Sequence, residues 1–482
     1  MASARRVRRP AAVAAIAAHR TVGVTGPTGF VGHALVAGLI EAGHGVRRLG
    51  RRPETFAPLE GVDDRAFDLD DDRLDATALA GVDTVFYLVH SMGGGTGFAD
   101  RDRGYAYRFA RAARGAGVRH VVYLGGLYPR GTALSEHLGS RREVGEILRR
   151  ECRALHVRAG IIIGSGGASF EIMCDLVRRL PVMVTPRWVS NRCQAVALSD
   201  AVGALVRAVD VAGDREVDLA GPDVLTYRDM LERMGRALGL RHRTIVDVPV
   251  LTPRLSAHWL RFITSVSLPV AQTLVESLRH DAVADGHDLF AEVGIRPCGF
   301  DEALRRALSD RPRVVRTSVA SRWEGGRSTQ TQRFLLSAAT QCDSQLLRRI
   351  DEELRRLTPR VALDVPRWHG DDLRIGAWSI LRLGPLVGAG ETWERTIDGG
   401  WLAAHPGGVL SLVCRDGRGG PVVEASVAGY APRLPRIAYV TLQERLHRIL
   451  VTSAIRRALS PQARLGPMPL SVVNSSHFAR SR

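Results

Sequence analysis

Three glycines near the start of the chain have the spacing of a phosphate-binding turn. Gly26, Gly29 and Gly32 lie in TGPTGFVG, between a short apolar run and an Ala- and Leu-rich run. Glycine lets the backbone turn tightly and approach a pyrophosphate, whose charge is attracted to the start of the following helix. The pattern predicts a dinucleotide site that includes Thr28 and Phe30. An incidental glycine turn is the alternative.

Arginines stand where an acidic residue would select NAD(H). A carboxylate that binds the ribose hydroxyls is expected about 20 residues after the glycines. The sequence there reads RLGRRPE and contains Arg51 and Arg52. Guanidinium groups suit a 2′-phosphate because they form bidentate, charge-assisted bonds. We therefore expect NADP(H) to be favoured over NAD(H), with solvated surface arginines as the alternative.

Two further stretches follow predicted strands and could line the nucleotide. Asp68 and Leu69, in FDLDD, could border the adenine, and an exposed acidic turn is equally compatible with them. His90 ends YLVH, at the edge of the sheet where ligands bind. It could line the nicotinamide side or simply cap its strand.

The elements that must position these residues alternate between apolar runs and helical stretches from residue 21 to 200. Strand and helix in repetition predict an α/β fold with a doubly wound parallel sheet. Val31, Leu35 and Leu39 share one helix face, and Gly43 follows as a helix C-terminus. Residues 160–310 carry several prolines, and we expect them to cap the sheet within one domain, 21–310.

The second half of the chain has a different pattern. Residues 311–331 are polar and Arg-rich and are predicted to be a linker, whereas 373–432 show successive strands followed by an amphipathic helix from about 434. We expect a smaller α+β domain over 332–482, in which an antiparallel sheet grips one helix. His369, Asp371 and Asp372 are close in sequence, but an exposed turn is favoured there over a metal site.

The composition excludes several other functions. The 482 residues carry a formal charge of +17, all of the basic residues being arginine, and no nucleic-acid motif accompanies that charge. The six cysteines form no CxxC pair, so we expect a reducing compartment and no zinc site. Residues 1–20 are expected to be a disordered basic leader. The longest apolar stretch, from Trp259, is interrupted by Arg261 and Pro269, which favours buried helices over peripheral membrane contact.

Several of these stretches together carry a family resemblance. TGPTGFVG, FYLVHSM, VVYLGGL, SEHLGSRREVGEIL and CQAVALSDAVGAL resemble atypical short-chain dehydrogenases/reductases, the NmrA-like branch that is also similar to the NAD(P)-binding accessory subunit of respiratory complex I. The resemblance covers residues 21–308 and implies a Rossmann fold. Residues 332–482 resemble the domain that often follows this branch, which is similar to helix-grip, START-like folds and implies a hydrophobic ligand.

The resemblance also implies where catalysis would occur. Active members of the superfamily use a Tyr-x-x-x-Lys pair, and the matching stretch here is HLGSR, with His137 in place of the tyrosine and Arg141 in place of the lysine. Histidine is a competent acid or base, arginine can hold a ribose, and Ser135 could orient a carbonyl. The alternative is a helix that only contacts the nucleotide.

We therefore expect a cytoplasmic oxidoreductase-like protein that binds NADP(H). Its substrate would be a carbonyl, quinone or enone of an apolar small molecule. A non-catalytic NADP(H) sensor or assembly factor is the alternative, and turnover separates the two.

Overall fold

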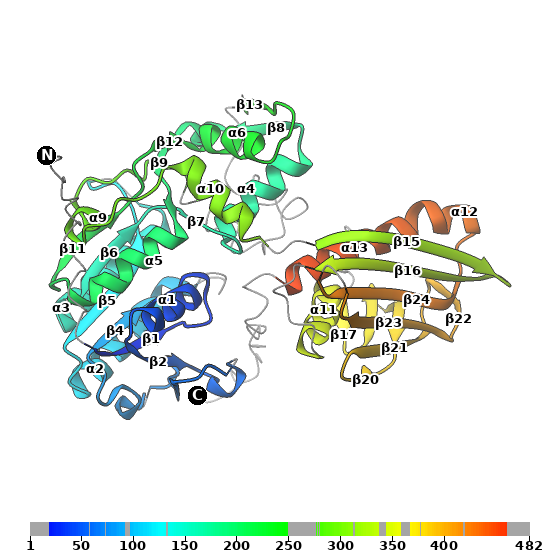
Figure 1. The fold of residues 1–482 in the computed structure, drawn as a ribbon, viewed down its shortest axis with the longest axis horizontal. Helices are drawn as coiled ribbons and strands as arrows, with labels where there is room; N and C mark the ends of the chain where they lie inside the picture. The colour runs from blue at the N-terminus through cyan, green and yellow to red at the C-terminus, as the bar shows by residue number, and fades with distance from the viewer. Residues whose placement is uncertain are drawn as a thin grey trace, which may run out of the picture. The chain divides into compact units, whose positions relative to one another are not determined.

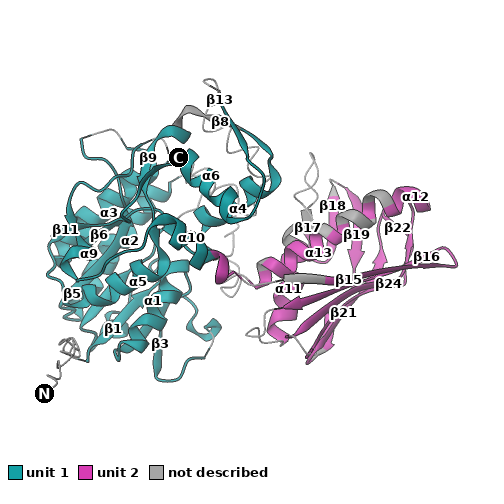
Figure 2. Ribbon diagram, turned by 45° about the horizontal axis from the view of Figure 1, so that its top comes forward, with its two compact units in different colours: residues 1–307 teal, residues 308–482 magenta. Residues whose placement is uncertain are grey.

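The computed structural model describes residues 19–459, apart from 57, 73, 92–96, 132–133, 249–275, 277, 279, 312–313, 337–343, 358–366, 376 and 418–419. The expected leader and the apolar stretch from Trp259 therefore lie almost entirely outside the described residues. The chain divides into two compact units, residues 1–307 and 308–482 (Figure 2).

The first unit is built on an eight-stranded sheet in which every pair of neighbours is parallel. Its order is β14-β11-β6-β5-β4-β1-β2-β3 (Figure 1). The strands are β1 (Thr21–Thr25), β2 (Gly45–Gly50), β3 (Val62–Ala66), β4 (Thr84–Tyr87), β5 (His120–Gly126), β6 (Leu155–Ala159), β11 (Arg215–Leu219) and β14 (His287–Asp288). The order reverses between β1 and β4, and such a reversal opens a crevice at the carboxyl ends of the strands.

Helices cover both faces of this sheet, so its strands need not alternate between apolar and polar residues. On one face the core joins β1, β4 and β6 to α1 (Phe30–Glu41), α5 (Leu198–Arg207) and α9 (Leu289–Glu292). On the other face it joins β4 and β5 to α2 (Phe98–Gly115) and α3 (Glu136–Cys152). All four residues of β4 are buried as a result. The predicted doubly wound α/β fold is confirmed.

Residues 160–307 belong to this same unit. They contribute three short strand pairs: β7 (Ile162–Ile163) with β10 (Val196–Ala197), β8 (Val182–Pro186) with β13 (Thr244–Val248), and β9 (Arg192–Gln194) with β12 (Val224–Thr226). Besides α5 and α9, the described helices in this region include α4 (Ala168–Arg179), α6 (Tyr227–Ala237) and α10 (Phe300–Ser309).

The second unit begins with a hairpin where a linker was predicted. Strands β15 (Val314–Glu324) and β16 (Arg327–Leu336) pair antiparallel across Gly325 and Gly326, both of which have positive φ, as a two-residue hairpin turn requires. The linker prediction is therefore wrong for residues 314–331. The other strands are β17 (Arg367–His369), β18 (Asp372–Ile375), β19 (Trp378–Leu383), β20 (Val387–Ala389), β21 (Thr392–Gly399), β22 (Ala403–His405), β23 (Gly408–Arg415) and β24 (Val422–Pro432).

Two helices pack on one face of this sheet, whose order is β15-β16-β24-β23-β21-β19-β18-β17 (Figure 1). They are α11 (Ser344–Leu357) and α13 (Glu444–Ala458). The predicted terminal helix is interrupted, because α12 (Arg436–Ala438) and a π-helical turn over Tyr439–Gln443 precede α13. Within the described residues, no helix is both long and apolar enough to span a bilayer.

One cysteine departs from the expectation of a reducing compartment. Cys414, in β23, is disulfide-bonded, whereas Cys152, Cys174, Cys193 and Cys298 are not. Asp371 and Asp372, considered above for a metal site, are instead in ion pairs with arginines, as in the contact of 2.8 Å between Arg395 Nη1 and Asp371 Oδ1.

Candidate functional site

The turn between β1 and α1 has the geometry that its three glycines predict. Gly26 has φ of +63°, and the N–H of Gly29 donates to the Gly26 carbonyl at 3.0 Å. A Cβ atom on Gly32 would lie only 2.1 Å from that carbonyl oxygen, so only glycine fits. No side chain caps the start of α1. Its first N–H groups are therefore available to an anion beside the turn, where Thr28 is partly exposed.

Phe30 connects this turn to a second glycine-rich loop. Cβ atoms on Gly164 and Gly167 would lie 2.9 and 2.8 Å from Cζ of Phe30. These glycines therefore make room for the ring, and residues 164–167 are buried. The loop therefore packs against the start of α1.

The arginines at the end of β2 are half exposed. Arg51 has half of its side chain exposed, and its Nη1 lies 3.8 Å from Asp70 Oδ2, while Arg52 is also exposed. The two arginines inside the strand have closer acidic partners. Arg47 pairs with Asp63 at 2.7 Å, and Arg48 pairs with Asp64 at 2.6 Å. Arg51 is thus held more loosely by its acidic partner than Arg47 and Arg48 are by theirs.

Asp68 and Leu69 form the turn after β3. Oδ1 of Asp68 accepts the N–H of Asp70 at 3.0 Å. The Leu69 side chain is 5% exposed and packs in the core beneath α2, so only its backbone faces outward, accepting from Arg108. Of the two side chains, only that of Asp68 lies outside the core, where it could contact a nucleotide.

His90, His137 and Arg141 converge at the carboxyl end of β4. His90 follows β4, and both His137 and Arg141 lie in the first turns of α3. The pKa of His90 is well below its usual value because of burial, then Arg141, then His137. Burial and Arg141 lower the pKa of His137 to about 3. Both imidazoles are therefore neutral at pH 7.

This group adjoins the glycine turn. A Cβ atom added to Gly26 would lie 3.5 Å from the Leu88 carbonyl oxygen. Thr25 Oγ1 donates to the Phe86 carbonyl at 3.1 Å and accepts the Leu88 N–H at 3.0 Å. The end of β1 and the strand that leads to His90 are thereby tied together.

Two members of the predicted catalytic group have structural contacts. Ser135 caps α3, its Oγ accepting the N–H of Leu138 at 3.3 Å. Arg141 lies partly buried, with Nη1 at 3.4 Å from the Leu124 carbonyl. Its Nε is buried without a partner in the described part of the chain. Buried donors are normally paired, so this unpaired N–H beside the two histidines is consistent with a site where a bound ligand accepts its hydrogen bond.

Asp102 is a site residue that the sequence did not reveal. This buried carboxylate on α2 accepts two hydrogen bonds, one from the N–H of Ser91 at 2.8 Å and one from the hydroxyl of Ser140 at 3.2 Å. Ser91 follows His90, and Ser140 precedes Arg141. Asp102 therefore holds together the two segments that carry the site, and the only sequence clue is an acid on the apolar face of a helix.

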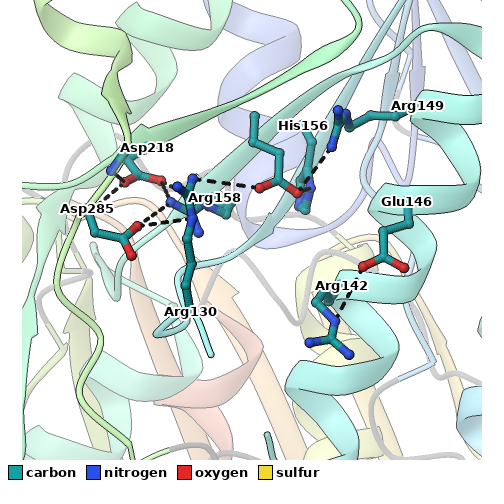
Figure 3. Close-up of polar contacts among 10 residues, drawn as sticks. Arg130, Arg142, Glu146, Arg149, His156, Arg158, Asp218 and Asp285 are labelled. Atoms are coloured by element: carbon teal, nitrogen blue, oxygen red, sulfur yellow. Dashed lines mark hydrogen bonds and ion pairs between the residues drawn. The ribbon is translucent and has the colours of Figure 1, made fainter. Parts of the chain in front are cut away.

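A buried ion network lies on β6 and β11 (Figure 3). Arg158 and Asp218 are almost fully buried, with Nη2 and Oδ1 2.6 Å apart, and Arg158 Nη2 is also 2.8 Å from Oδ1 of Asp285. His156 Nδ1 lies 3.2 Å from Glu216 Oε1. The network fixes Asp285, which is remote in sequence, to the sheet.

Comparison with known proteins identifies the cofactor class. A family described as NAD(P)H-binding matches residues 26–156. The N-terminal part of the chain is an NAD(P)H-binding domain.

Two curated mycobacterial relatives match part of the chain. A "3-beta-hydroxysteroid dehydrogenase" of Mycolicibacterium neoaurum is 34% identical over 110 residues, which are 21% of this chain and 30% of the relative. A "3 beta-hydroxysteroid dehydrogenase/Delta 5-->4-isomerase" of Mycobacterium tuberculosis is 33% identical over 110 residues, with the same coverage. The chain thus matches 30% of the length of these relatives.

Solved structures with similar folds include a UDP-galactose 4-epimerase, which is 20% identical with a TM-score of 0.44 and covers 60% of this chain and 98% of its own. A UDP-glucose 4-epimerase of Thermotoga maritima is 14% identical with a TM-score of 0.47, and the match covers 60% of this chain and 97% of that one.

Proposed function

We propose that the first unit is an NADP(H)-dependent oxidoreductase that acts on a carbonyl, quinone or enone of an apolar small molecule. The observation that carries the proposal is the meeting of the glycine turn with His90, His137 and Arg141 at one edge of the sheet. The curated relatives are named as hydroxysteroid dehydrogenases, which supports an alcohol–ketone conversion on an apolar molecule.

The chain's residues fit the cofactor in three places. The tight turn closed by Gly26 and Gly32, together with the uncapped start of α1, would hold the pyrophosphate. Arg51 accepts a 2′-phosphate at the end of β2, because its pairing with Asp70 at 3.8 Å is loose. Arg141, whose Nε–H has no partner among the described residues, would hold the ribose.

The nicotinamide, when bound, supplies a hydride to the carbonyl carbon, and the chain must then stabilise the developing charge on oxygen. With a pKa of about 3, His137 is not protonated at pH 7 and meets this need by donating its neutral N–H to that oxygen. Water supplies the proton that the alkoxide takes up, because a neutral imidazole that gave up its N–H would be left as an imidazolate. Ser135 stays at the helix cap.

The low pKa of His137 also favours a second candidate, a non-catalytic NADP(H) sensor or assembly factor. A general acid works best when its pKa lies near the operating pH, and this one lies far below it.

Turnover decides between the two functions. The full chain is incubated with NADPH and a panel of ketones, quinones and enones that includes 3-ketosteroids, and NADPH oxidation is followed. We expect oxidation that His137→Ala lowers about 10²- to 10³-fold, the usual effect of removing one hydrogen-bond donor from an oxyanion site. NADPH affinity should stay near wild type, and so should the exposed control His242→Ala. No oxidation above background with any member of the panel, together with intact NADPH binding, rejects the oxidoreductase in favour of the sensor.

A further inference from the structure

Strand β15 forms one edge of the sheet of the second unit (Figure 1). Among the described strands, β16 alone pairs with it, along its inner side. Every residue from 317 to 322 is exposed, although successive side chains of a strand point to opposite faces of the sheet. Another strand can therefore approach the outer side of β15 without displacing a described one.

This edge lacks the features that usually keep strands apart. Edge strands are typically short, or carry charges, prolines or bulges that prevent further pairing. Strand β15 spans Val314–Glu324, and residues 317–321, TSVAS, include neither a charge nor a proline. Its register with β16 shifts only between Arg316 and Ser318, so residues 318–324 form a regular stretch. That stretch is long enough to accept a further strand.

The hairpin turn determines which backbone groups face outward. Glu324 and Arg327 flank the two-residue turn, where opposing residues bond to each other. Alternate residues of an antiparallel strand direct their N–H and C=O groups to opposite sides. Counting back from Glu324, the residues that direct these groups away from β16 are Val319, Ser321 and Trp323.

These three residues also share one face of the sheet. The ring of Trp323 lies 5.7 Å from that of Tyr439, which places them on the face that carries the helices. When β15 pairs antiparallel with a second copy of itself about Ser321, Val319 of each copy lies opposite Trp323 of the other. Pairs of aromatic and β-branched side chains across strands stabilise sheets. Val319 is 37% exposed and therefore has apolar surface left to bury.

The opposite face is also compatible with this register. Ala320 of each copy lies opposite Arg322 of the other, and Ser318 lies opposite Glu324. Like charges are therefore not placed directly opposite each other, an arrangement that would be unfavourable. Within one copy Arg322 and Glu324 form an ion pair at 3.3 Å, which balances their charges.

We propose that β15 is an interface between two copies of this chain, which pair their β15 strands antiparallel about a two-fold axis at Ser321. The pairing adds about six backbone hydrogen bonds and makes one continuous sheet from two. It uses the same edge of both copies, so association ends at a dimer. An interface of one strand pair is small, and we expect a weak, reversible dimer. The interface is independent of the proposed oxidoreductase function, since it belongs to the other compact unit.

Cysteine cross-linking of the full chain tests the register. In Ser321→Cys the two Cα atoms at the axis would lie about 5.5 Å apart, a separation that a disulfide spans. We expect a covalent dimer after mild oxidation, with the disulfide located by mass spectrometry at the introduced thiols. The matched control is Ser318→Cys, which is exposed on the same strand. Its two copies would lie about 20 Å apart and should not be cross-linked to each other.

Sedimentation at several protein concentrations tests the dimer itself. We expect wild type to dimerise reversibly and Ser321→Lys to raise the dissociation constant about tenfold or more, because two ammonium groups would then face each other. Ser318→Lys places its charge opposite Glu324 and should dimerise at least as tightly as wild type. Both variants should bind NADPH like wild type, which separates this test from that of the cofactor site.

Three results would overturn the proposal. The first is a wild-type chain that stays monomeric at every concentration, as expected if this edge pairs instead with an extended segment of another protein. The second is a dimer that Ser321→Lys does not weaken. The third is a Ser321→Cys variant that is not cross-linked through the introduced thiol, or is cross-linked no better than Ser318→Cys.

Discussion

Replacing Gly32 with alanine tests the nucleotide turn directly. The added Cβ would lie 2.1 Å from the Gly26 carbonyl oxygen, whereas ordinary contacts begin at 3.4 Å, so the turn and α1 must move apart by about 1 Å. The pyrophosphate then loses at least one charge-assisted bond, worth about 1.5 to 3 kcal/mol. We therefore expect NADPH affinity to fall about 10- to 150-fold.

Calorimetry measures the affinity, and urea unfolding without nucleotide measures the separate cost of the clash. That cost should be about 1 to 3 kcal/mol, the usual range for overpacking. Gly203→Ala is the control, because its Cβ in α5 would meet only Ile295, at 3.5 Å. It should bind NADPH like wild type.

A milder substitution keeps the test usable if Gly32→Ala unfolds. A Cβ on Gly29 would lie 3.2 Å from the same carbonyl oxygen, which the turn can relieve by shifting a few tenths of an ångström. We expect a smaller loss of affinity than at Gly32. NADPH binding by Gly32→Ala within twofold of wild type would refute the assignment of this turn to the pyrophosphate.

Three further predictions concern neighbouring residues. In calorimetry, Arg51→Ala should weaken NADPH binding about tenfold or more and leave NADH binding unchanged. The control Arg236→Ala, on α6, should leave the binding of both nucleotides unchanged. Equal affinities of the wild-type protein for NADPH and NADH would contradict this prediction. Asp102→Asn should lower the free energy of unfolding in urea by about 1.5 to 3 kcal/mol, and an unchanged value would contradict its bonding role. His137 has a folded pKa of about 3 against 6.5 unfolded, so its contribution to stability is complete above pH 6.5 and is lost as pH falls toward 3, by about 4 kcal/mol at most; His137→Gln should flatten that part of the stability–pH curve, and an unaltered curve would contradict the burial.

The parallel sheet and the nucleotide turn could be predicted because both depend on local sequence. A strand such as TVFY is buried on both faces and therefore apolar throughout, and the three glycines act within eight residues. The hairpin of β15 and β16 was missed for a physical reason. Its inward residues on β16 include Ser328, Gln330 and Gln332, so the apolar alternation that marks a strand is absent. Arginine-rich composition then suggested a linker, although EGGR is a hairpin turn.

The contacts that complete the first site are long-range and leave little trace in the sequence. Arg158 and Asp218 are 60 residues apart, and Asp102 reaches segments 11 and 38 residues away. An acid on an apolar helix face was the one available clue to Asp102. The place of His137 one turn before Arg141 could be inferred from family resemblance. Its burial could not, because burial depends on how α2 and α3 pack.

That burial determines what His137 can do. Protonating it at pH 7 means working about four pH units above its pKa, at a cost of about 5 kcal/mol. A mechanism that needs a preformed imidazolium would be slowed about 10⁴-fold, as much as general acid catalysis can contribute. Catalysis at this site is therefore compatible with the geometry only if His137 acts while neutral, by hydrogen bonding to the oxygen that gains charge. Arg141, beside it, keeps the imidazole neutral and also stabilises an anion, so the feature that weakens His137 as an acid strengthens the pair as an oxyanion site.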